Sequence, residues 1–383
     1  MIENYVYKIE VLTPIVIGSG RERILTRLDY ISEGNTIYVV DVNRLISSLS
    51  FNEAKDFSDR LIKFGNLKDA IKNTDFKRFL KYKIKCADRV DNRKIGVTLT
   101  KDVNNYVYIP GSSIKGAIRT AIYYKVFNEA KENLKKELQK LMNEIIKKPH
   151  NNIKDNIKEY NRKGDKLLLK IFTSKETDQP HFDPLRFLRI TVTNSLPVYE
   201  NAEIFRIALF KICQKPLTFV EGFIPNRLFF GKIYFDRFLW NNSYEIWRKE
   251  FKRLDLLNIS ALSKILNEFA ERIIEHELKF AINHKLSTIE TFYQNLKDEL
   301  KKLSADESII RIGWGSGYFS TTLGLLFIEM NILKDIRKAF RLGKSSFEFP
   351  ATRKFAFYKN KLYPLGWAKI AFSKQNNLNI FNL

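Results

Sequence analysis

The residues from Tyr108 to Ala121, YIPGSSIKGAIRTA, have the types and spacing of an anion-binding helix start. Pro110 and Gly111 interrupt a strand, and Ser112 and Ser113 after them are common N-cap residues. Apolar side chains then recur at helical spacing, which predicts a helix from this point. Free backbone N–H groups and the positive end of the helix dipole meet here, an arrangement that favours a phosphate.

Two cations follow the serines on the predicted helix. Lys115 and Arg119 are four residues apart and therefore share one helical face, from which both side chains can reach a bound backbone. An ordinary capped helix with a solvated Lys/Arg face has the same pattern. The spacing alone does not separate these two interpretations.

The composition favours the anion-binding interpretation and indicates a polyanionic partner. The 383 residues contain 66 Lys+Arg and 43 Asp+Glu, a formal net charge of +23. Residues 60–101 hold 13 basic and 4 acidic residues, and 131–170 hold 12 and 6. In 60–101 aromatic residues are interleaved with the basic ones, which is typical of nucleic-acid binding but also fits the core stripe of a helix. The mixed charges of 131–170 fit a solvated helix equally well.

Length and composition predict a two-domain cytoplasmic protein. A chain with 44% hydrophobic residues can bury a large core. Cys86 and Cys213 belong to no CxxC or Cys/His cluster, and we interpret them as reduced structural residues. No signal peptide or bilayer-length apolar run is recognisable, so neither secretion nor a membrane partner is expected.

The hydrophobic pattern predicts an α+β fold in which two halves each combine a sheet with helices. A charged, helical stretch at about 123–170 follows the first strands, and amphipathic helices at about 244–303 follow the later ones. We interpret both stretches as insertions between sheet elements. The strands expected from the alternation are 5–11, 15–17, 28–31, 36–40, 107–109, 187–192, 202–210, 217–223, 228–235 and 309–312, and a short helix is expected at 320–328.

Two further glycine turns follow predicted strands. Glycine permits the close approach of another backbone or of a ligand. Each turn alone also fits a plain hairpin, but together, in a basic chain, they favour contact with a polyanion. Neither these turns nor the central one has a P-loop ending or a dinucleotide fingerprint, so NTP or NAD chemistry is not indicated. The candidate binding residues are Gly18, Ser19, Gly20, Arg21 and Arg23 in the early turn, and Gly313, Gly315, Ser316 and Gly317 in the late turn.

Five motifs, taken in order, resemble the RAMP superfamily of CRISPR proteins. Within it the chain is most similar to the family of fifth Csm subunits of type III-A effector complexes. The resemblance runs from about residue 5 to residue 370, and the central motif and 182–189 are its most specific parts. The motifs are LTPIVIGSG at 12–20, IPGSSIKGAIRTA at 109–121, FDPLRFLR at 182–189, GWGSGY at 313–318 and YPLGW at 363–367.

The resemblance implies two ferredoxin-like (RRM-like) RAMP domains with helical insertions, which we place at 1–185 and 186–383. It implies that the protein binds the 3′ portion of the CRISPR RNA guide and contacts neighbouring Csm backbone subunits. It also implies a part in 3′-end maturation of the guide through recruited cellular nucleases. The family's phosphate-facing helix start corresponds here to Gly111, Ser112, Ser113, Lys115 and Arg119, and its RNA-binding turns to the two glycine turns above. Such contacts hold sugar and phosphate without reading bases.

The sequence does not show a catalytic constellation, and we expect a non-catalytic RNA-binding cap subunit without a metal or another cofactor. His181 is the best-placed general base because Arg186 and Arg189 are nearby, but a loop histidine is more often structural. His276 and His284 lack the HExxH spacing of a zinc site, and we interpret them as surface residues. The alternative that stays open is a RAMP-type endoribonuclease that cleaves CRISPR repeat RNA.

Overall fold

Strand β1 (Ile2–Val11) is central in the first sheet because it is paired along both of its edges. It runs antiparallel to β13 (Trp367–Lys374) on one side and to β9 (Leu228–Asp236) on the other. The alternating side chains of Ile9 and Val11 are buried, as the period of a strand with one face in the core requires. The beginning of the chain is thus held between two strands from its second half.

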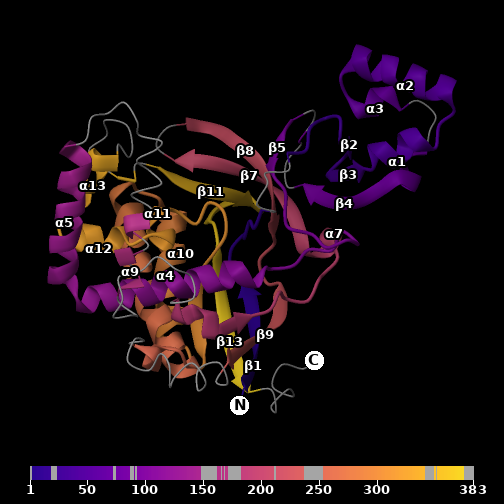
Figure 1. The fold of residues 1–383 in the computed structure, drawn as a ribbon. Helices are drawn as coiled ribbons and strands as arrows, with labels where there is room; N and C mark the ends of the chain where they lie inside the picture. Colours follow the sequence, from indigo (N-terminus) through magenta and orange to yellow (C-terminus); the bar gives the residue numbers. More distant parts are fainter. Residues whose placement is uncertain are drawn as a thin grey trace.

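The computed structural model arranges the chain as two sheets with helices packed against them, which confirms the predicted α+β fold class (Figure 1). Sheet A has the strand order β10 (Glu307–Arg311), β13, β1, β9 and β6 (Leu188–Ile190). Sheet B has the order β12 (Lys361–Pro364), β11 (Arg353–Tyr358), β7 (Ala202–Phe210), β4 (Leu80–Cys86), β3 (Thr36–Val40) and β2 (Tyr30–Glu33), and β8 (Cys213–Phe223) pairs with both β7 and β5 (Ile95–Val97). The structure describes residues 2–18, 24–71, 75–86, 90, 93–147, 162–164, 166–167, 169–170, 183–210, 213–236, 253–340, 349–350 and 352–374.

Each sheet combines strands from both halves of the chain. Sheet A places β1 among strands of the second half, and sheet B pairs β4 with β7 in parallel at Lys85 and Glu203. The proposed division into domains at 1–185 and 186–383 stays a prediction.

Helix α9 (Ile259–Asn283) is the main helix of the core. It begins at Asn258, whose side chain accepts a hydrogen bond from the Ala261 N–H at 3.0 Å. Its buried stripe packs against β10, α10 (Ser287–Lys301) and α4 (Gly111–Glu129). The remaining helical elements are α1 (Val42–Ser47), α2 (Phe51–Phe64), α3 (Leu67–Ala70), α5 (Lys131–Lys147), α7 (Val198–Asn201), α11 (Tyr318–Thr321), α12 (Gly324–Glu329), α13 (Leu333–Phe340) and the 3₁₀ turns η1 (Phe76–Phe79), η4 (Pro184–Phe187) and η5 (Leu254–Leu256). In the described part of the chain, no helix combines the length and the apolar character needed to cross a membrane.

Helices α1 to α3 and the β2–β4 end of sheet B extend away from the rest of the molecule (Figure 1). We call this part the α1–α3 lobe. Asp41 caps α1 by accepting a hydrogen bond from the Arg44 N–H at 3.2 Å. A small separate core that includes Leu45 and Phe57 holds the lobe together. Much of the basic segment 60–101 therefore belongs to a projecting part of the surface.

Most predicted strands are present. Segments 15–17 and 107–109 form isolated bridges instead of strands: Ile15 bridges Phe223 at the end of β8, and Val107 bridges Lys101 and Leu196. The predicted helix 320–328 is divided into α11 and α12, since the backbone of Thr322 between them is extended. Parts of both predicted insertions, 148–161 and 244–252 among them, lie outside the described residues.

A buried ion cluster joins helix α9 to both sheets. The carboxylate of Glu277, 3% exposed, accepts hydrogen bonds at 3.0 and 2.8 Å from Nε of Arg353 in β11. A guanidinium nitrogen of Arg311 in β10 lies 3.9 Å from the same carboxylate, and Arg311 Nε donates to the Leu365 carbonyl at 3.0 Å. Because β10 belongs to sheet A and β11 to sheet B, one carboxylate balances buried charge from both sheets.

Removal of the Glu277 charge should strongly destabilise the protein. We expect Glu277→Gln to lower the free energy of unfolding by about 3–5 kcal/mol, because two guanidinium groups stay buried without an opposite charge. Glu275→Gln is the matched control, since Glu275 on the same helix pairs with Lys297 near the surface. It should cost at most about 1 kcal/mol. Urea denaturation measures both losses, and equal losses would contradict the role given to the cluster.

Candidate nucleic-acid interface

Helix α4 begins at Gly111, and the predicted capping by Ser112 and Ser113 is wrong. The N-cap residue is Pro110, which makes no side-chain cap hydrogen bond, and both serines lie in the first helical turn. The cause is a close contact with β6, where a Cβ at position 111 would overlap the carbonyl oxygen of Ile190. Glycine lets the helix start against this strand. The first amide groups of α4 are consequently left without a side-chain cap.

The two cations of α4 contact the segment that contains η4 and β6. Nζ of Lys115 donates to the Leu188 carbonyl at 2.8 Å, and the guanidinium of Arg119 pairs with Asp183 at 2.5 Å. Burial lowers the pKa of Lys115, Asp183 opposes this effect, and Arg119 and Arg189 add to it. The structure therefore brings the central motif and the FDPLRFLR motif together, as two parts of one surface.

Arg189 extends this basic surface. Its side chain is 60% exposed, and a guanidinium nitrogen lies 2.8 Å from the carboxylate of Asp236. At the start of α4, Ser112 is exposed, whereas Gly111 is buried. A phosphate at this point would meet backbone amides and cations together. We name this group the α4 surface, and it comprises Gly111, Ser112, Lys115, Arg119 and Arg189.

The segment that leads into the early glycine turn contacts the late turn and the neighbouring Gly366. The Trp314 N–H donates to the Val16 carbonyl at 2.7 Å, and the Gly366 N–H donates to the Pro14 carbonyl at 2.9 Å. Gly313 has φ +86°, and a Cβ there would overlap the Val16 carbonyl oxygen. The glycine at 313 therefore permits the close approach of another backbone, as expected for these turns, although the sequence did not identify Val16 as the partner.

Only part of the predicted binding positions in these turns reaches solvent. Gly315 packs on Leu365, and the buried Ser316 donates from its hydroxyl to the Gly313 carbonyl at 2.8 Å. Gly317 is exposed. Gly18 is half-buried and bridges Leu99. Binding of RNA by these turns stays a prediction, and Ser19, Gly20, Arg21 and Arg23 lie outside the described residues.

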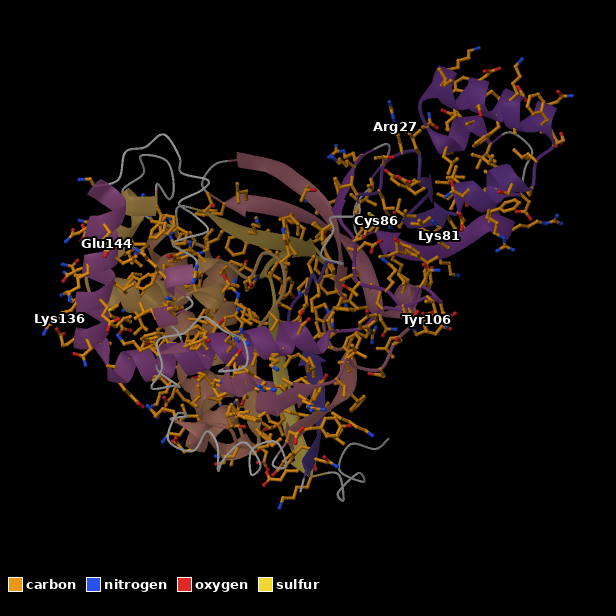
Figure 2. The ribbon with its side chains drawn as sticks, viewed as in Figure 1. Arg27, Lys81, Cys86, Tyr106, Lys136 and Glu144 are labelled. Carbon is orange, nitrogen blue, oxygen red and sulfur yellow. The ribbon has the colours of Figure 1, made fainter. Side chains whose placement is uncertain are left out.

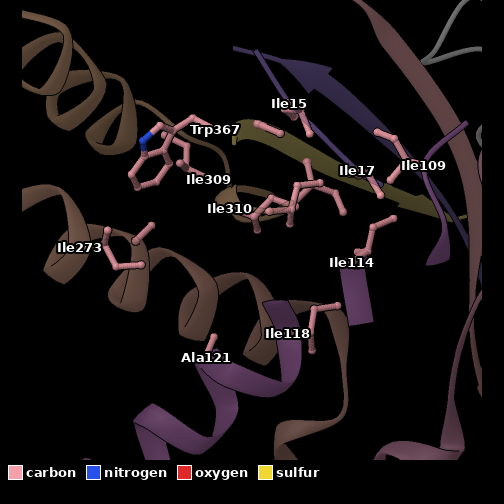
Figure 3. Close-up of a cluster of buried hydrophobic side chains, with 14 of the residues drawn as sticks. Ile15, Ile17, Ile109, Ile114, Ile118, Ala121, Ile273, Ile309, Ile310 and Trp367 are labelled. Atoms are coloured by element: carbon pink, nitrogen blue, oxygen red, sulfur yellow. The ribbon is translucent and has the colours of Figure 1, made fainter. Parts of the chain in front are cut away.

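The three turns share one part of the hydrophobic core (Figure 3). Ile17 leads into the early turn, Ile109 precedes the start of α4, and Ile310 precedes the late turn, and all three are buried in the same cluster. Figure 3 shows Ile17, Ile109 and Ile114 beside one another. The predicted binding positions that the structure describes are thus mounted on a packed core, which fixes their backbone geometry.

An aromatic and basic pair beside the late turn was missed by the sequence reasoning. Nζ of Lys354 lies 4.2 Å from the ring centroid of Trp314, and burial lowers the pKa of this lysine. Trp314 belongs to a recognised motif, but no sequence signal connects it to Lys354 in β11. The two residues meet through tertiary packing, because Lys354 lies in β11 and Trp314 in the late turn.

Two of the histidines pack against aromatic rings. The ring centroids of His276 and Phe319 are 4.2 Å apart, and those of His284 and Phe280 are 4.4 Å apart. Both histidines are half-buried, so they lie at the surface with part of each ring covered by a neighbouring side chain. His150 and His181 lie outside the described residues. Among the residues that the structure describes, no three of His, Cys, Asp and Glu are grouped so that they could hold a metal ion.

Comparison with known proteins relates most of the chain to one family. The family model described as RAMP superfamily matches residues 8–320. A protein of Methanocaldococcus jannaschii named "CRISPR system Cms protein Csm5" is 27% identical over 399 residues, which cover 95% of this chain and 88% of that protein.

Two solved structures have the same fold. One is a chain of the "Cryo-EM structure of Csm-crRNA-target RNA ternary complex in type III-A CRISPR-Cas system", with a TM-score of 0.67 and 24% identity over 97% of this chain and 100% of that chain. The other is the "Crystal structure of T.onnurineus Csm5", with a TM-score of 0.61 and 20% identity over 94% of this chain and 99% of that chain.

Two glycines of α4 should respond in opposite ways to alanine. Gly111→Ala places a methyl group against the Ile190 carbonyl and should lower the free energy of unfolding by about 1–3 kcal/mol. Gly116→Ala should raise it by about 0.5–1 kcal/mol, because this exposed helical position has no atom within 4 Å of the new methyl group. Thermal unfolding compares the two variants. A Gly111→Ala variant as stable as the parent would show that the helix start does not pack as described.

Proposed function

The chain belongs to the RAMP superfamily, and we propose that it serves as a subunit of a Csm-type effector complex of type III-A CRISPR systems. Its similarity to a Csm5 protein over 95% of its length supports this role, as does its likeness to a chain of a complex with crRNA and target RNA. Its partners are CRISPR RNA and neighbouring Csm subunits. Within the complex it holds the 3′ portion of the guide without catalysis, and it supports 3′-end maturation by recruited nucleases.

The observation that carries the RNA-binding role is the α4 surface. There the uncapped start of a long helix lies beside Lys115, Arg119 and Arg189. Backbone amides and cations at one point bind a phosphate. A site that binds phosphate and sugar accepts any base sequence, which a guide-binding protein requires because guides differ in sequence.

The intramolecular partners of these cations leave them available for RNA. Arg119 is 42% exposed in its pair with Asp183, and Arg189 is 60% exposed in its pair with Asp236. Only the arginine side of each pair is open to water, because the carboxylates of Asp183 and Asp236 are 17% and 7% exposed. A phosphate can contact the exposed side of each guanidinium while the ion pair within the protein is kept.

Loss of the α4 cations should weaken RNA binding and reduce its salt dependence. For the double variant Lys115→Ala/Arg119→Ala we expect weaker binding of a single-stranded CRISPR repeat–spacer RNA. We also expect the slope of log K against log salt to be smaller by roughly 0.7 per lost phosphate contact. Fluorescence anisotropy across a salt series measures both. Thermal unfolding of the variant is measured alongside to check its stability, because both side chains also make contacts within the protein.

The matched control is Lys135→Ala/Lys136→Ala in α5, which removes the same charge elsewhere. Figure 2 shows Lys136 on the outer side of α5. This control should keep the parental slope within the error of the measurement. An unchanged slope in the α4 variant, or equal losses in both variants, would reject the α4 surface as the phosphate site.

The integrity of the RNA in the same samples separates binding from cleavage. Intact RNA is the expected result for a binding subunit. Specific cleavage of repeat RNA that is abolished by His181→Ala would replace the proposed role with that of an endoribonuclease.

A further inference from the structure

A pocket of 430 Å³ lies over the start of β7, where the β2–β3 turn, the end of β4, helix α7 and the β11–β12 turn converge. Figure 2 shows Cys86, which lines this pocket, between the α1–α3 lobe and the rest of the molecule. Its volume is in the range of pockets that hold small ligands. Its lining does not include the residues of the α4 surface. We name it the β7 pocket.

The lining of the β7 pocket favours an anion. Lys85, Arg206 and Lys359 line it together with one carboxylate, that of Glu203. Burial raises the pKa of Glu203, and Lys85 and Lys359 act in the opposite direction. Cations therefore outnumber the acidic group in this lining, and the half-buried carboxyl offers a hydrogen-bond acceptor.

Flat rings lie beside these cations. The guanidinium of Arg206 lies 4.0 Å from the ring centroid of Phe357, and Nζ of Lys85 lies 4.8 Å from that of Tyr199. Aromatic faces next to cations are the combination with which proteins stack a nucleobase and bind its phosphate. A simple anion such as a carboxylate would use the cations and leave the rings unused.

Polar groups on two turns complete the pocket. Asn35 lies in the β2–β3 turn, and Lys359 and Asn360 form the turn between β11 and β12. Both residues of the second turn have positive φ, 47° and 61°, as tight hairpin turns require. The amides at these positions can hydrogen-bond to base edges and ribose hydroxyls.

We propose that the β7 pocket binds one nucleotide unit, a nucleobase with its phosphate, from single-stranded RNA. The base stacks on Tyr199, and Lys85 and Lys359 contact the phosphate. The carboxylate of Glu203 accepts a hydrogen bond from an exocyclic amino group, so the pocket prefers bases that carry one. Cytosine is therefore preferred to uracil, which has a carbonyl oxygen at that position. A free nucleoside monophosphate offers the same chemistry. The inference does not depend on membership of a Csm complex.

Binding of short RNAs to the full-length protein tests the proposal. Fluorescence anisotropy with hexamers of cytidine and of uridine should show tighter binding of the cytidine hexamer. Tyr199→Ala should weaken that binding by on the order of tenfold, whereas Tyr199→Phe, which keeps the ring, should stay within about twofold of the parent. The same loss should occur in the Lys115→Ala/Arg119→Ala background. RNA binding by the β7 pocket is thereby tested separately from RNA binding by the α4 surface.

Lys83→Ala is the matched control for Lys85→Ala. Nζ of Lys83 also lies over the ring of Tyr199, at 4.2 Å, but this lysine does not line the pocket. Lys85→Ala should weaken binding several-fold more than Lys83→Ala, because only Lys85 faces the bound phosphate. Equal losses would overturn the proposal, since they would indicate a general effect of charge.

Calorimetric titration with CMP shows whether the pocket binds a free nucleotide or only a nucleotide unit of an RNA strand. Binding of CMP that Tyr199→Ala abolishes would support the pocket as a site for free nucleotides as well as for RNA. Binding of the hexamer alone would support an RNA strand as its ligand. The proposal is overturned if Tyr199→Ala changes neither the binding of the cytidine hexamer nor the binding of CMP. It is also overturned if cytidine and uridine hexamers bind equally.

Discussion

The arrangement of the two sheets depends on the buried carboxylate of Glu277. It faces guanidinium groups from β10 and β11, so helix α9, sheet A and sheet B are fixed around one charge. Arg311 also binds the carbonyl of Leu365, whose side chain packs under Gly315 in the late turn. The position of that turn, and of the segment 14–17 hydrogen-bonded to it, follows from the same cluster. A buried charge that must be balanced thus helps to set where the late turn meets the segment that leads into the early turn.

Close backbone packing also determines which groups can bind RNA. Gly111 and Gly313 are the points where one backbone lies directly on another, so these glycines serve the fold first. The groups left for a ligand are the uncapped amides of α4 and the cations around them. Because α4 starts against β6 at the edge of sheet A, these groups are held in place before RNA arrives.

The sequence predicts those elements whose side chains alternate between core and solvent. Strands β3 and β7 have the predicted bounds, because period-2 burial is a local property of the chain. The start of α4 was misplaced by two or three residues, since its position is set by contact with Ile190, far away in the chain. The FDPLRFLR motif was recognised, but its contact with Lys115 was not, and the β7 pocket left no local signal because its lining comes from separate segments. The features that the sequence did not predict are formed by tertiary contacts between segments that are far apart in the chain.

Hydrogen exchange of the protein with and without single-stranded CRISPR repeat–spacer RNA tests most directly whether the α4 surface holds the phosphates. We predict that RNA slows amide exchange in the first turn of α4, at 111–113, and in 183–190, with a smaller change in α5. Protection confined to α5, with unchanged exchange at 111–113 and 183–190, would contradict this. It would indicate that the RNA binds the basic segment 131–170 instead.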